Sequence, residues 1–236
     1  MLHIITPVKD SIESTEETLR ALAASTLSEA HVFRVYNDFS TEENTARLRE
    51  LCAELGIELV NLSDLTDHPS PNYLFVLRRE RKACLQEGAG LLIVESDVTV
   101  RPGTLQSLAE GARTEENCGM AAAVTVDADG NINYPYEFAR KLPCGKVEST
   151  KHMSFCCTLL TQRLLQEVDF DALDETKNWF DVTISHESRA KGLKNLLFTS
   201  LPVTHRPHQS RPWKQLKYKS PLKYYWRKLT KGLDKI

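Results

Sequence analysis

Short apolar runs, separated by segments with helical spacing of their apolar positions, occupy the first half of the chain. The runs predict buried strands at 2–6, 31–36, 57–61, 91–94 and 120–126. The segments between them predict helices at 13–25, 41–55 and 73–86. Gly56 and Gly88 are expected to end the second and third of these helices. Pro7 should end the first strand because it lacks an N–H, and Pro102 should lie in the first turn of a fourth helix.

Beyond residue 130 the pattern loosens, and an irregular stretch is expected to reach about residue 153. Helices at 161–168 and 180–190 and a strand at 195–203 complete the predicted body. Strands that alternate with helices at this spacing predict an α/β fold, a Rossmann-like single domain with a mostly parallel central sheet flanked by helices.

Polar clusters follow three of the predicted strands, at 7–10, 37–40 and 95–97. In a parallel sheet the carboxyl ends of the strands meet at one edge, and ligands bind there near a switch in strand order. The three clusters are therefore expected to line one binding site.

Composition places the chain among ordinary globular proteins, with 236 residues, 41% hydrophobic and 26% charged. No apolar run approaches the length of a membrane helix, and the first residues do not have the pattern of a signal peptide. The six cysteines contain no CxxC pair, which favours reduced thiols over disulfides or a zinc site. We expect a soluble, cytoplasmic protein.

Charge divides the chain into a predicted domain at 1–205 and a basic, aromatic tail at 206–236. The tail has ten Lys or Arg and one acid, whereas residues 1–205 have 20 bases and 31 acids. Lysines interleaved with aromatic residues, among them Trp213, Tyr218 and Trp226, suit the anionic inner face of the cell membrane. The alternative is a helix that packs back on the body. Nucleic acid is the weaker expectation because the body is acidic.

The usual glycine-rich phosphate loops are missing from this sequence. Neither GxGxxG nor GxxxxGK[ST] occurs, so another positive group is needed to neutralise a bound diphosphate. In LLIVESDVTV, Glu95 and Asp97 follow a buried strand, and residues two apart in extended chain point the same way. They could hold Mg²⁺ or Mn²⁺, with Asp97 as the direct ligand and Glu95 acting through water or on a ribose. Both acids could instead simply cover a strand end.

Six short motifs in order resemble a family 2 glycosyltransferase of the GT-A fold. IITPVKD at 4–10 is similar to the family's opening strand and PVYN-like stretch, and VYNDFST at 35–41 is similar to its DDGST-like turn. Arg79 lies sixteen residues before Glu95, as a helix arginine of the family does, and Glu95-Ser96-Asp97 matches the DxD motif.

The last two motifs lie in the second half of the chain. NWFDVTISHESRAKG has Asp181 eleven residues before Gly192, like the family's ED pair and later glycine, and LPVTH ends in His205. The resemblance covers about residues 2–205. Asn37, Phe39, Glu95 and Phe180 depart from the family pattern, which marks the chain as a divergent member.

The resemblance implies a nucleoside-diphosphate sugar as donor and a role for each matching residue. Thr6 and Pro7 would wall the nucleotide, Asp38 would accept a hydrogen bond from its base, and Arg79 would reach the diphosphate. Glu95 and Ser96 would also contact the donor. Asp97 and His205 would hold Mn²⁺ or Mg²⁺, and the imidazole would favour Mn²⁺. Asp181 would be the general base of an inverting transfer, with Trp179 stacked on the acceptor sugar.

Each of these residues also has a structural alternative. Asp38 and Ser40 could form an ordinary turn, and Arg78 and Arg81 compete with Arg79. Asp181 could be an N-cap, and Trp179 could fill the core. His208 competes with His205.

The expected function is transfer of a sugar to a hydroxyl acceptor, a glycan or a lipid-linked one, in cell-surface glycan synthesis. Two alternatives remain open: a sugar-nucleotide-binding module without catalysis, and a sugar nucleotidyltransferase. The second normally has a glycine-rich loop after its first strand, and TPVKDSIES contains no glycine.

Overall fold

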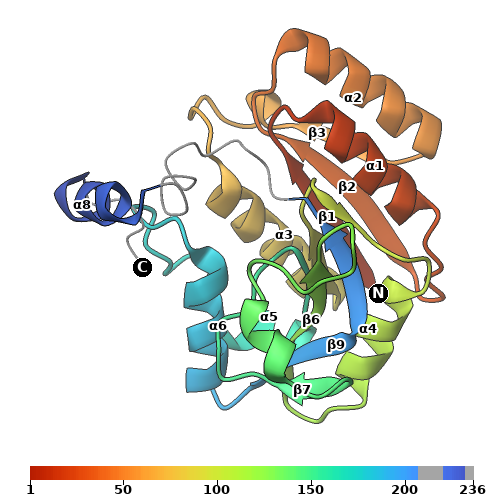
Figure 1. The fold of residues 1–236 in the computed structure, drawn as a ribbon. Helices are drawn as coiled ribbons and strands as arrows, with labels where there is room; N and C mark the ends of the chain where they lie inside the picture. The colour runs from red at the N-terminus through yellow and green to blue at the C-terminus, as the bar shows by residue number, and fades with distance from the viewer. Residues whose placement is uncertain (207–219, 232–236) are drawn as a thin grey trace.

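Strand β4 (Gly90–Val94) has every residue buried, which requires a packed layer on each side of it. Leu91 and Ile93 belong to one hydrophobic core, and Leu92 and Val94 belong to a second. This alternation has the period of two that a strand imposes on its side chains. The structure, a computed structural model, describes residues 1–206 and 220–231 and has a helical layer on each side of the sheet (Figure 1).

The N-terminal half forms the parallel part of the sheet. Strands β1 (Leu2–Val8), β2 (His31–Asn37) and β3 (Glu58–Asn61) join β4 in the spatial order β3-β2-β1-β4, all parallel. The intervening helices are α1 (Ile12–Ala23), α2 (Glu42–Leu55), the 3-10 helix η1 (Leu62–Asp64) and α3 (Tyr73–Glu87). The predicted alternation of strands and helices is confirmed, and the carboxyl ends of β1, β2 and β4 meet at one edge.

The second half extends the sheet beyond β4 in the order β8-β6-β9-β5. Its strands are β5 (Val98–Thr99), β6 (Cys118–Val126), β7 (Lys146–Glu148), β8 (Cys157–Leu160) and β9 (Lys194–His205). Its helices are α4 (Thr104–Arg113), the 3-10 helix η2 (Glu137–Lys141), α5 (Gln162–Glu167) and α6 (Phe180–Ala190). Strands β5, β7 and β8 are antiparallel to their neighbours, and the other six of the nine run in one direction, so the sheet is mostly parallel.

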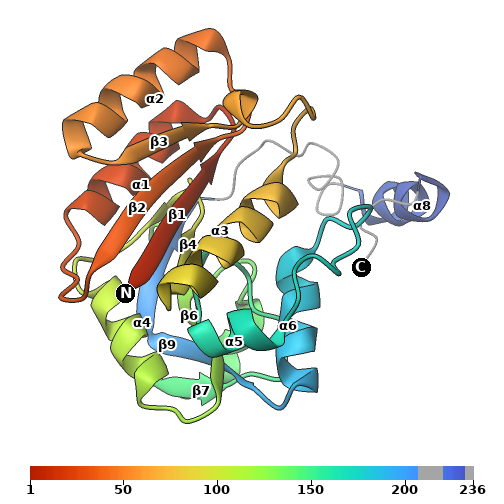
Figure 2. The same ribbon diagram turned by 180° about the vertical axis from the view of Figure 1, so that it is seen from behind.

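Helices cover both faces of this curled sheet. Helices α3, α5 and α6 pack with one core, and α1, α2 and α4 lie on the opposite face (Figure 2). The α/β fold predicted from the sequence is therefore correct.

Two glycines end helices as predicted, and two prolines do not behave as predicted. Gly56 and Gly88 are the C-caps of α2 and α3, with φ of 67° and 65° in the left-handed region. Pro102 precedes α4 instead of lying in its first turn. The amide of Thr104 donates to the carbonyl of Arg101 at 3.0 Å, which makes Pro102 the second residue of a turn, a position that suits its fixed φ.

The expectation that Pro7 ends β1 is wrong. Pairing with β2 continues through Pro7 to Val8, whereas pairing with β4 stops at Ile5. The carbonyl of Val8 points towards β2 and accepts a hydrogen bond from the amide of Asp38 at 2.8 Å. Since adjacent residues of a strand bond opposite neighbours, the nitrogen of Pro7 faces the side on which β4 has already ended. Its missing N–H therefore breaks no bond.

Three strands of the second half were not predicted. Strands β5 and β7 have two and three residues, too few for a recognisable period, and β7 and η2 interrupt the stretch expected to be irregular. Strand β8 is four residues long and buried between β4 and β6. These short strands nevertheless place part of the candidate site described below.

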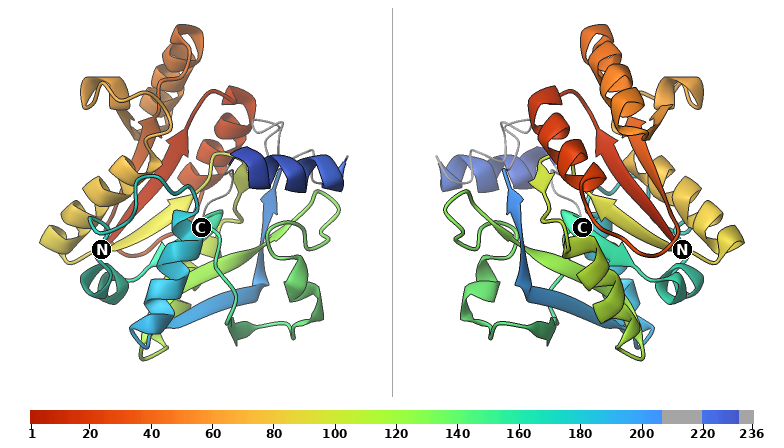
Figure 3. Two further views of the ribbon diagram at one scale, coloured as in Figure 1. Left: turned by 90° about the vertical axis from the view of Figure 1, so that its left-hand side faces the viewer. Right: turned by 90° about the vertical axis from the view of Figure 1, so that its right-hand side faces the viewer.

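Helix α8 (Pro221–Lys231) is the part of the basic tail that the structure describes. Trp213 and Tyr218, and most of the proposed junction between the domain at 1–205 and the tail, lie outside the described residues. Helix α8 lies off one side of the body (Figure 1), and it overlaps the body when that side faces the viewer (Figure 3, left). Tyr224 is buried, whereas Trp226 is exposed. Of the helices that the structure describes, none combines the length and the apolar character needed to cross a membrane.

A buried polar network links α3 to the sheet. The Glu80 carboxylate, 1% exposed, accepts from the Tyr36 hydroxyl and lies 2.8 Å from Nδ1 of His3 and 3.3 Å from the Arg34 guanidinium. Nε2 of His3 lies 3.3 Å from Glu87. Burial and then the charge of Glu80 raise the pKa of Tyr36 well above its ordinary value. The network fixes α3, which carries the candidate donor-binding residue Arg79.

We predict that Glu80→Gln lowers the free energy of unfolding by about 3 kcal/mol, because it removes the charge that compensates Arg34 and its buried partners. Urea denaturation followed by circular dichroism measures this change. Glu54→Gln is the matched control, since it removes an exposed partner of Arg20 and should leave the denaturation midpoint unchanged. Equal midpoints for the two variants would contradict the assigned role of Glu80.

Candidate functional site

Polar contacts tie together the loops that follow β1 and β2. The amide of Asp10 donates to the Ser40 hydroxyl at 2.8 Å, and the amide of Thr41 donates to the Asp10 carboxylate at 2.8 Å. The bond from Thr41 is the main cause of a lowered pKa for Asp10. Thr41 also caps α2 through its hydroxyl, which accepts from the amide of Asn44. Two of the three predicted polar clusters therefore form one bonded edge.

The Asp38 carboxylate holds the loop that leads into α3. Oδ2 accepts from the Ser70 hydroxyl at 2.7 Å and from the amide of Asn72 at 3.0 Å, and Oδ1 accepts from the Asn72 side chain at 2.7 Å. These bonds join Asp38 to residues more than thirty positions away, so they are not the local bonds of the ordinary turn considered as its structural alternative. Oδ1 retains acceptor capacity for one further hydrogen bond, so a base could still donate to it.

Phe39 takes the position of the glycine in the resembled turn and keeps a left-handed backbone, with φ of 57°. Such a conformation costs an ordinary L-residue roughly 1–2 kcal/mol. The Phe39 ring packs against the main core, and its carbonyl accepts from Lys9 at 2.6 Å. These contacts offset the strain and preserve the turn without glycine.

Glu95, Ser96 and Asp97 form a turn and not an extended segment, so the expectation from extended-chain geometry is wrong. The amide of Val98 donates to the carbonyl of Glu95 at 3.1 Å, which closes the turn between β4 and β5. Ser96 and Asp97 are each 8% exposed. The two acids still face one region, because the turn and β5 together direct them there.

Strand β5 brings His205 beside Asp97. Val98 pairs with His205 in the antiparallel β5–β9 ladder, and the amide of Arg206 donates to the carbonyl of Asp97 at 3.0 Å. Nε2 of His205 lies 3.5 Å from Oδ2 of Asp97, and Nδ1 lies 2.8 Å from the carbonyl of Tyr134. Burial acts to lower the pKa of His205, but the bond and charge of Asp97 outweigh it and raise this pKa.

Cys156 completes a group of possible metal ligands. Its thiol lies 3.3 Å from Oε2 of Glu95 and 3.9 Å from Nε2 of His205. One donor atom from each of these three residues lies within 4.8 Å of the others. Burial, followed by the charge of Glu95, raises the pKa of the Cys156 thiol well above its ordinary value. All six cysteines are free, as the sequence predicts.

The charges of Asp181 and Glu95 both affect the pKa of the Tyr73 hydroxyl. Burial raises the pKa of Tyr73 well above its ordinary value, and the charges of Glu95 and then Asp181 add to this effect. Asp181 lies in the first turn of α6, and its Oδ1 accepts from the next amide, that of Val182, at 2.9 Å. It is therefore not the N-cap, a position that Trp179 occupies without capping the helix through its side chain. Trp179 is half-buried.

Thr6 and Pro7, which were predicted to contact the nucleotide, differ in solvent exposure. Thr6 is fully buried, and its hydroxyl oxygen has no hydrogen-bond partner among the described residues. Pro7 is partly exposed, so of the two it is the one that can wall a ligand.

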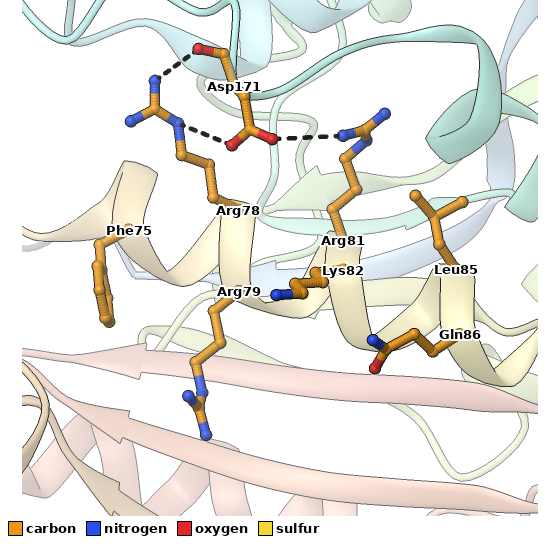
Figure 4. Close-up of a pocket in the computed structure, with 8 residues that line it drawn as sticks. All are labelled: Phe75, Arg78, Arg79, Arg81, Lys82, Leu85, Gln86 and Asp171. Atoms are coloured by element: carbon orange, nitrogen blue, oxygen red, sulfur yellow. Dashed lines mark hydrogen bonds and ion pairs between the residues drawn. The ribbon is translucent and has the colours of Figure 1, made fainter.

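Arg79 is separated from its two rivals by the direction of its side chain. Arg78 and Arg81 both point to Asp171, whereas Arg79 points to the opposite side, towards the first strands (Figure 4). On that side its charge acts to lower the pKa of Tyr36, against the larger effects of burial and Glu80. Arg78 and Arg81 also bind backbone carbonyls of the segment before α6, at Phe170 and Leu165. Arg78 and Arg81 therefore hold α3 to that segment. Of the three arginines, Arg79 is the exposed one that points towards the first strands.

Three residues at this site have no role that the sequence predicts: Cys156, Tyr73 and Tyr134. In the sequence Cys156 is next to Cys157 and has no metal-binding spacing, although a cysteine near a strand end is a possible ligand. Tyr134 acts through its backbone carbonyl, which any residue type would supply, so no sequence signal could have identified it.

Comparison with known proteins supports the fold. No protein-family model and no curated protein matches the chain. Among solved structures it is similar to the mannosyltransferase PcManGT from Pyrobaculum calidifontis in complex with GDP-Man and Mn²⁺, with a TM-score of 0.67 at 12% identity, covering 97% of this chain and 64% of that one.

The chain is also similar to S. aureus TarS 1–349, with a TM-score of 0.61 at 15% identity over 92% of this chain and 63% of that one. The same TarS fragment in complex with UDP-GlcNAc matches with a TM-score of 0.61 at 17% identity, over 88% and 59% of the two chains. The chain thus spans less than two thirds of the length of each of these structures. At these identities the similarity shows a shared fold, a mostly parallel, curled sheet flanked by helices.

We predict that Asp38→Ala frees the loop before α3, because three hydrogen-bond donors lose their acceptor. Loss of such bonds costs about 1–3 kcal/mol, so the amide of Asn72 should exchange with solvent roughly 5–100-fold faster. Hydrogen exchange followed by NMR measures this rate. Asp64→Ala, at an exposed position of η1, should leave the Asn72 rate unchanged. Unaltered exchange in Asp38→Ala would mean that the carboxylate does not hold the loop.

Proposed function

We propose that this protein is a metal-dependent glycosyltransferase that moves a sugar from a nucleoside diphosphate to a hydroxyl acceptor with inversion. The observation that carries the proposal is the convergence of Glu95, Asp97 and His205 at the carboxyl edge of the sheet, near Asp181. The fold is that of a mannosyltransferase solved with GDP-Man and Mn²⁺ and of a protein solved with UDP-GlcNAc, which supports a nucleotide-sugar donor.

The donor set fits a divalent cation. Asp97 and Glu95 supply carboxylate oxygens, and His205 is anchored through Nδ1 on the Tyr134 carbonyl, which orients Nε2 towards Asp97. Asp97 and His205 would hold Mn²⁺ or Mg²⁺, with Glu95 nearby. When bound, such an ion neutralises the charge that develops on the leaving diphosphate.

The other donor contacts come from the bonded edge of β1 and β2 and from α3. Asp38 lies at the end of β2 and would accept from the base, with Pro7 as a wall above Thr6. Ser96 lies in the turn between the two acids. Arg79 is six residues after Tyr73, roughly 9 Å further along the helix axis, and would neutralise the diphosphate from the α3 side.

Asp181 is the proposed general base. The acceptor hydroxyl oxygen attacks the anomeric carbon as the bond from that carbon to the diphosphate oxygen breaks, and the hydroxyl proton passes to the Asp181 carboxylate. Oδ1 of Asp181 is oriented by the amide of Val182. Trp179, two residues earlier, would stack on the acceptor sugar and position its hydroxyl.

We further propose that the acceptor is a glycan or lipid-linked glycan of the cell surface, reached at the anionic inner face of the membrane. Helix α8 supports this location: Leu222, Tyr225, Trp226 and Leu229 are exposed and recur at the spacing of one helical face. Tyr224, on the opposite side of the helix, is buried. The α8 sequence has four Lys or Arg and no acid, which suits a basic amphipathic helix lying on anionic lipid.

Two other functions are compatible with the same edge. A binding module would retain the donor contacts without a working base. A nucleotidyltransferase would bind a nucleoside triphosphate, and the lack of a glycine-rich loop after β1 speaks against it.

The donor site predicts that nucleoside diphosphates raise the melting temperature of the protein only together with Mn²⁺, because ligands of the native state stabilise it by mass action. A thermal-shift screen of UDP and GDP, with and without Mn²⁺, measures this. Asp97→Ala should lose the metal-dependent part of the shift, and Asp129→Ala, at an exposed turn, should keep it. Absence of a shift with every nucleotide would remove the main support for a donor site.

Catalysis is separated from binding by Asp181→Asn. This variant should keep the nucleotide-dependent shift but hydrolyse or transfer the sugar about 10²–10⁴-fold more slowly, because the amide cannot accept the proton. Glu187→Gln, an exposed acid on the same helix, is expected to retain full activity. A wild-type protein that binds sugar nucleotides yet turns over none of them would favour the binding module.

The α8 surface predicts co-sedimentation with vesicles that contain phosphatidylserine and weaker binding at high salt. The double change Leu222→Ser and Trp226→Ser should weaken binding at least about tenfold, since burial of one large apolar side chain contributes about 1.5–3 kcal/mol. Leu65→Ser alters an exposed apolar residue elsewhere and should have no effect. Equal binding by the double variant and the wild type would exclude α8 as the attachment.

A further inference from the structure

We infer that Cys156 makes this centre a site for a soft or borderline divalent cation, with Zn²⁺ bound more tightly than Mn²⁺ by Cys156, His205 and Glu95. The inference concerns the same centre as the proposed function. Competition between Zn²⁺ and Mn²⁺ rests on that function, because it assumes that Mn²⁺ binds there. Binding of Zn²⁺ is independent of that function, because it requires only these three side chains.

The spacing of the donor atoms suits a small tetrahedral ion. With Zn–S near 2.3 Å and Zn–N or Zn–O near 2.0–2.2 Å, two ligands of a tetrahedral ion lie about 3.4–3.6 Å apart. The observed separations bracket this range: 3.3 Å from the Cys156 sulfur to Glu95, and 3.9 Å from the same sulfur to Nε2 of His205. Oδ2 of Asp97 lies 3.5 Å from Nε2. The third separation, between the donor atoms of Glu95 and His205, is within 4.8 Å, and it would shorten as the site closes on an ion.

The surroundings of the three residues favour ligation. The Tyr134 carbonyl takes Nδ1 of His205 and leaves Nε2 to face the group, which is the usual orientation of a metal-binding imidazole. Cys156 is 2% exposed and stands beside Ser154, whose hydroxyl lies 3.3 Å from the sulfur. The backbone also fixes the pair, because the amide of Glu95 donates to the carbonyl of Cys156 at 3.0 Å.

The chemistry of the donors then decides which ion is preferred. Thiolate selects soft and borderline ions, and affinity for a given site rises from Mn²⁺ to Zn²⁺. On binding, the Cys156 sulfur forms a bond to the ion and its proton is released to solvent. Three protein ligands leave a fourth tetrahedral position, which a phosphate oxygen can fill. A site with an open position is the kind that takes part in catalysis.

Cadmium is the probe of choice, because its thiolate complexes absorb in the ultraviolet through ligand-to-metal charge transfer. Titration of the full chain with Cd²⁺ should give a saturating band at one equivalent, and Zn²⁺ should abolish the band at far lower concentration than Mn²⁺. Cys156→Ala should lose the band. Two control variants should keep the band. Cys157→Ala removes the adjacent thiol, whose pKa is raised by burial alone, and Cys144→Ala removes the exposed thiol.

A band that persists in Cys156→Ala, or disappears in Cys144→Ala, would overturn the inference. Should Cys156→Ala fail to fold, X-ray absorption at the zinc edge of the wild-type protein replaces it. A sulfur neighbour near 2.3 Å supports the site, and a shell of nitrogen and oxygen alone refutes it. Neither readout involves sugar transfer, so a protein that binds cadmium as described but turns over no donor would refute the proposed function and leave the metal site intact.

Discussion

The candidate site depends on the pairing of a two-residue strand, β5, with the end of β9. This ladder sets Val98 opposite His205 and so places the imidazole beside the turn that carries Glu95 and Asp97. The turn itself is positioned by β4, which pairs with β1. This pairing brings the polar residues that follow β1 and β4 to one edge of the sheet. Cys156 enters from the start of β8, on the other side of β4. Sheet topology thus gathers ligands that lie far apart in the chain.

Much of the fold follows from local rules. Parallel strands buried on both faces are continuous apolar runs, and the predicted runs all became strands. Gly56 and Gly88 ended helices because the left-handed C-cap costs glycine least. The polar clusters after β1 and β2 bond to each other, and the cluster after β4 lies at the same edge because β4 runs parallel to β1.

The remainder depended on contacts between distant segments. Whether Pro7 breaks a strand depends on where the neighbouring strand stops, and β4 stops early. Strands β5 and β8 are too short to have a period, so their pairing could not be predicted. Cys156 became a candidate ligand only when β8 was placed next to β4, and the Tyr134 carbonyl that orients His205 belongs to the backbone. Asp38 was correctly placed at the edge, but its contacts with Ser70 and Asn72 require the loop before α3.

The long separations between these ligands also determine when the centre can form. Glu95 and Cys156 are 61 positions apart, and Tyr134 and His205 are 71 apart. Contacts of such length are costly in chain entropy and close late, after the two halves have docked. An ion held there binds the completed fold and not the unfolded chain, and therefore adds to its stability. A chain that ended before β9 could still pair its first four strands but would have no centre, so bound metal would report that folding has finished.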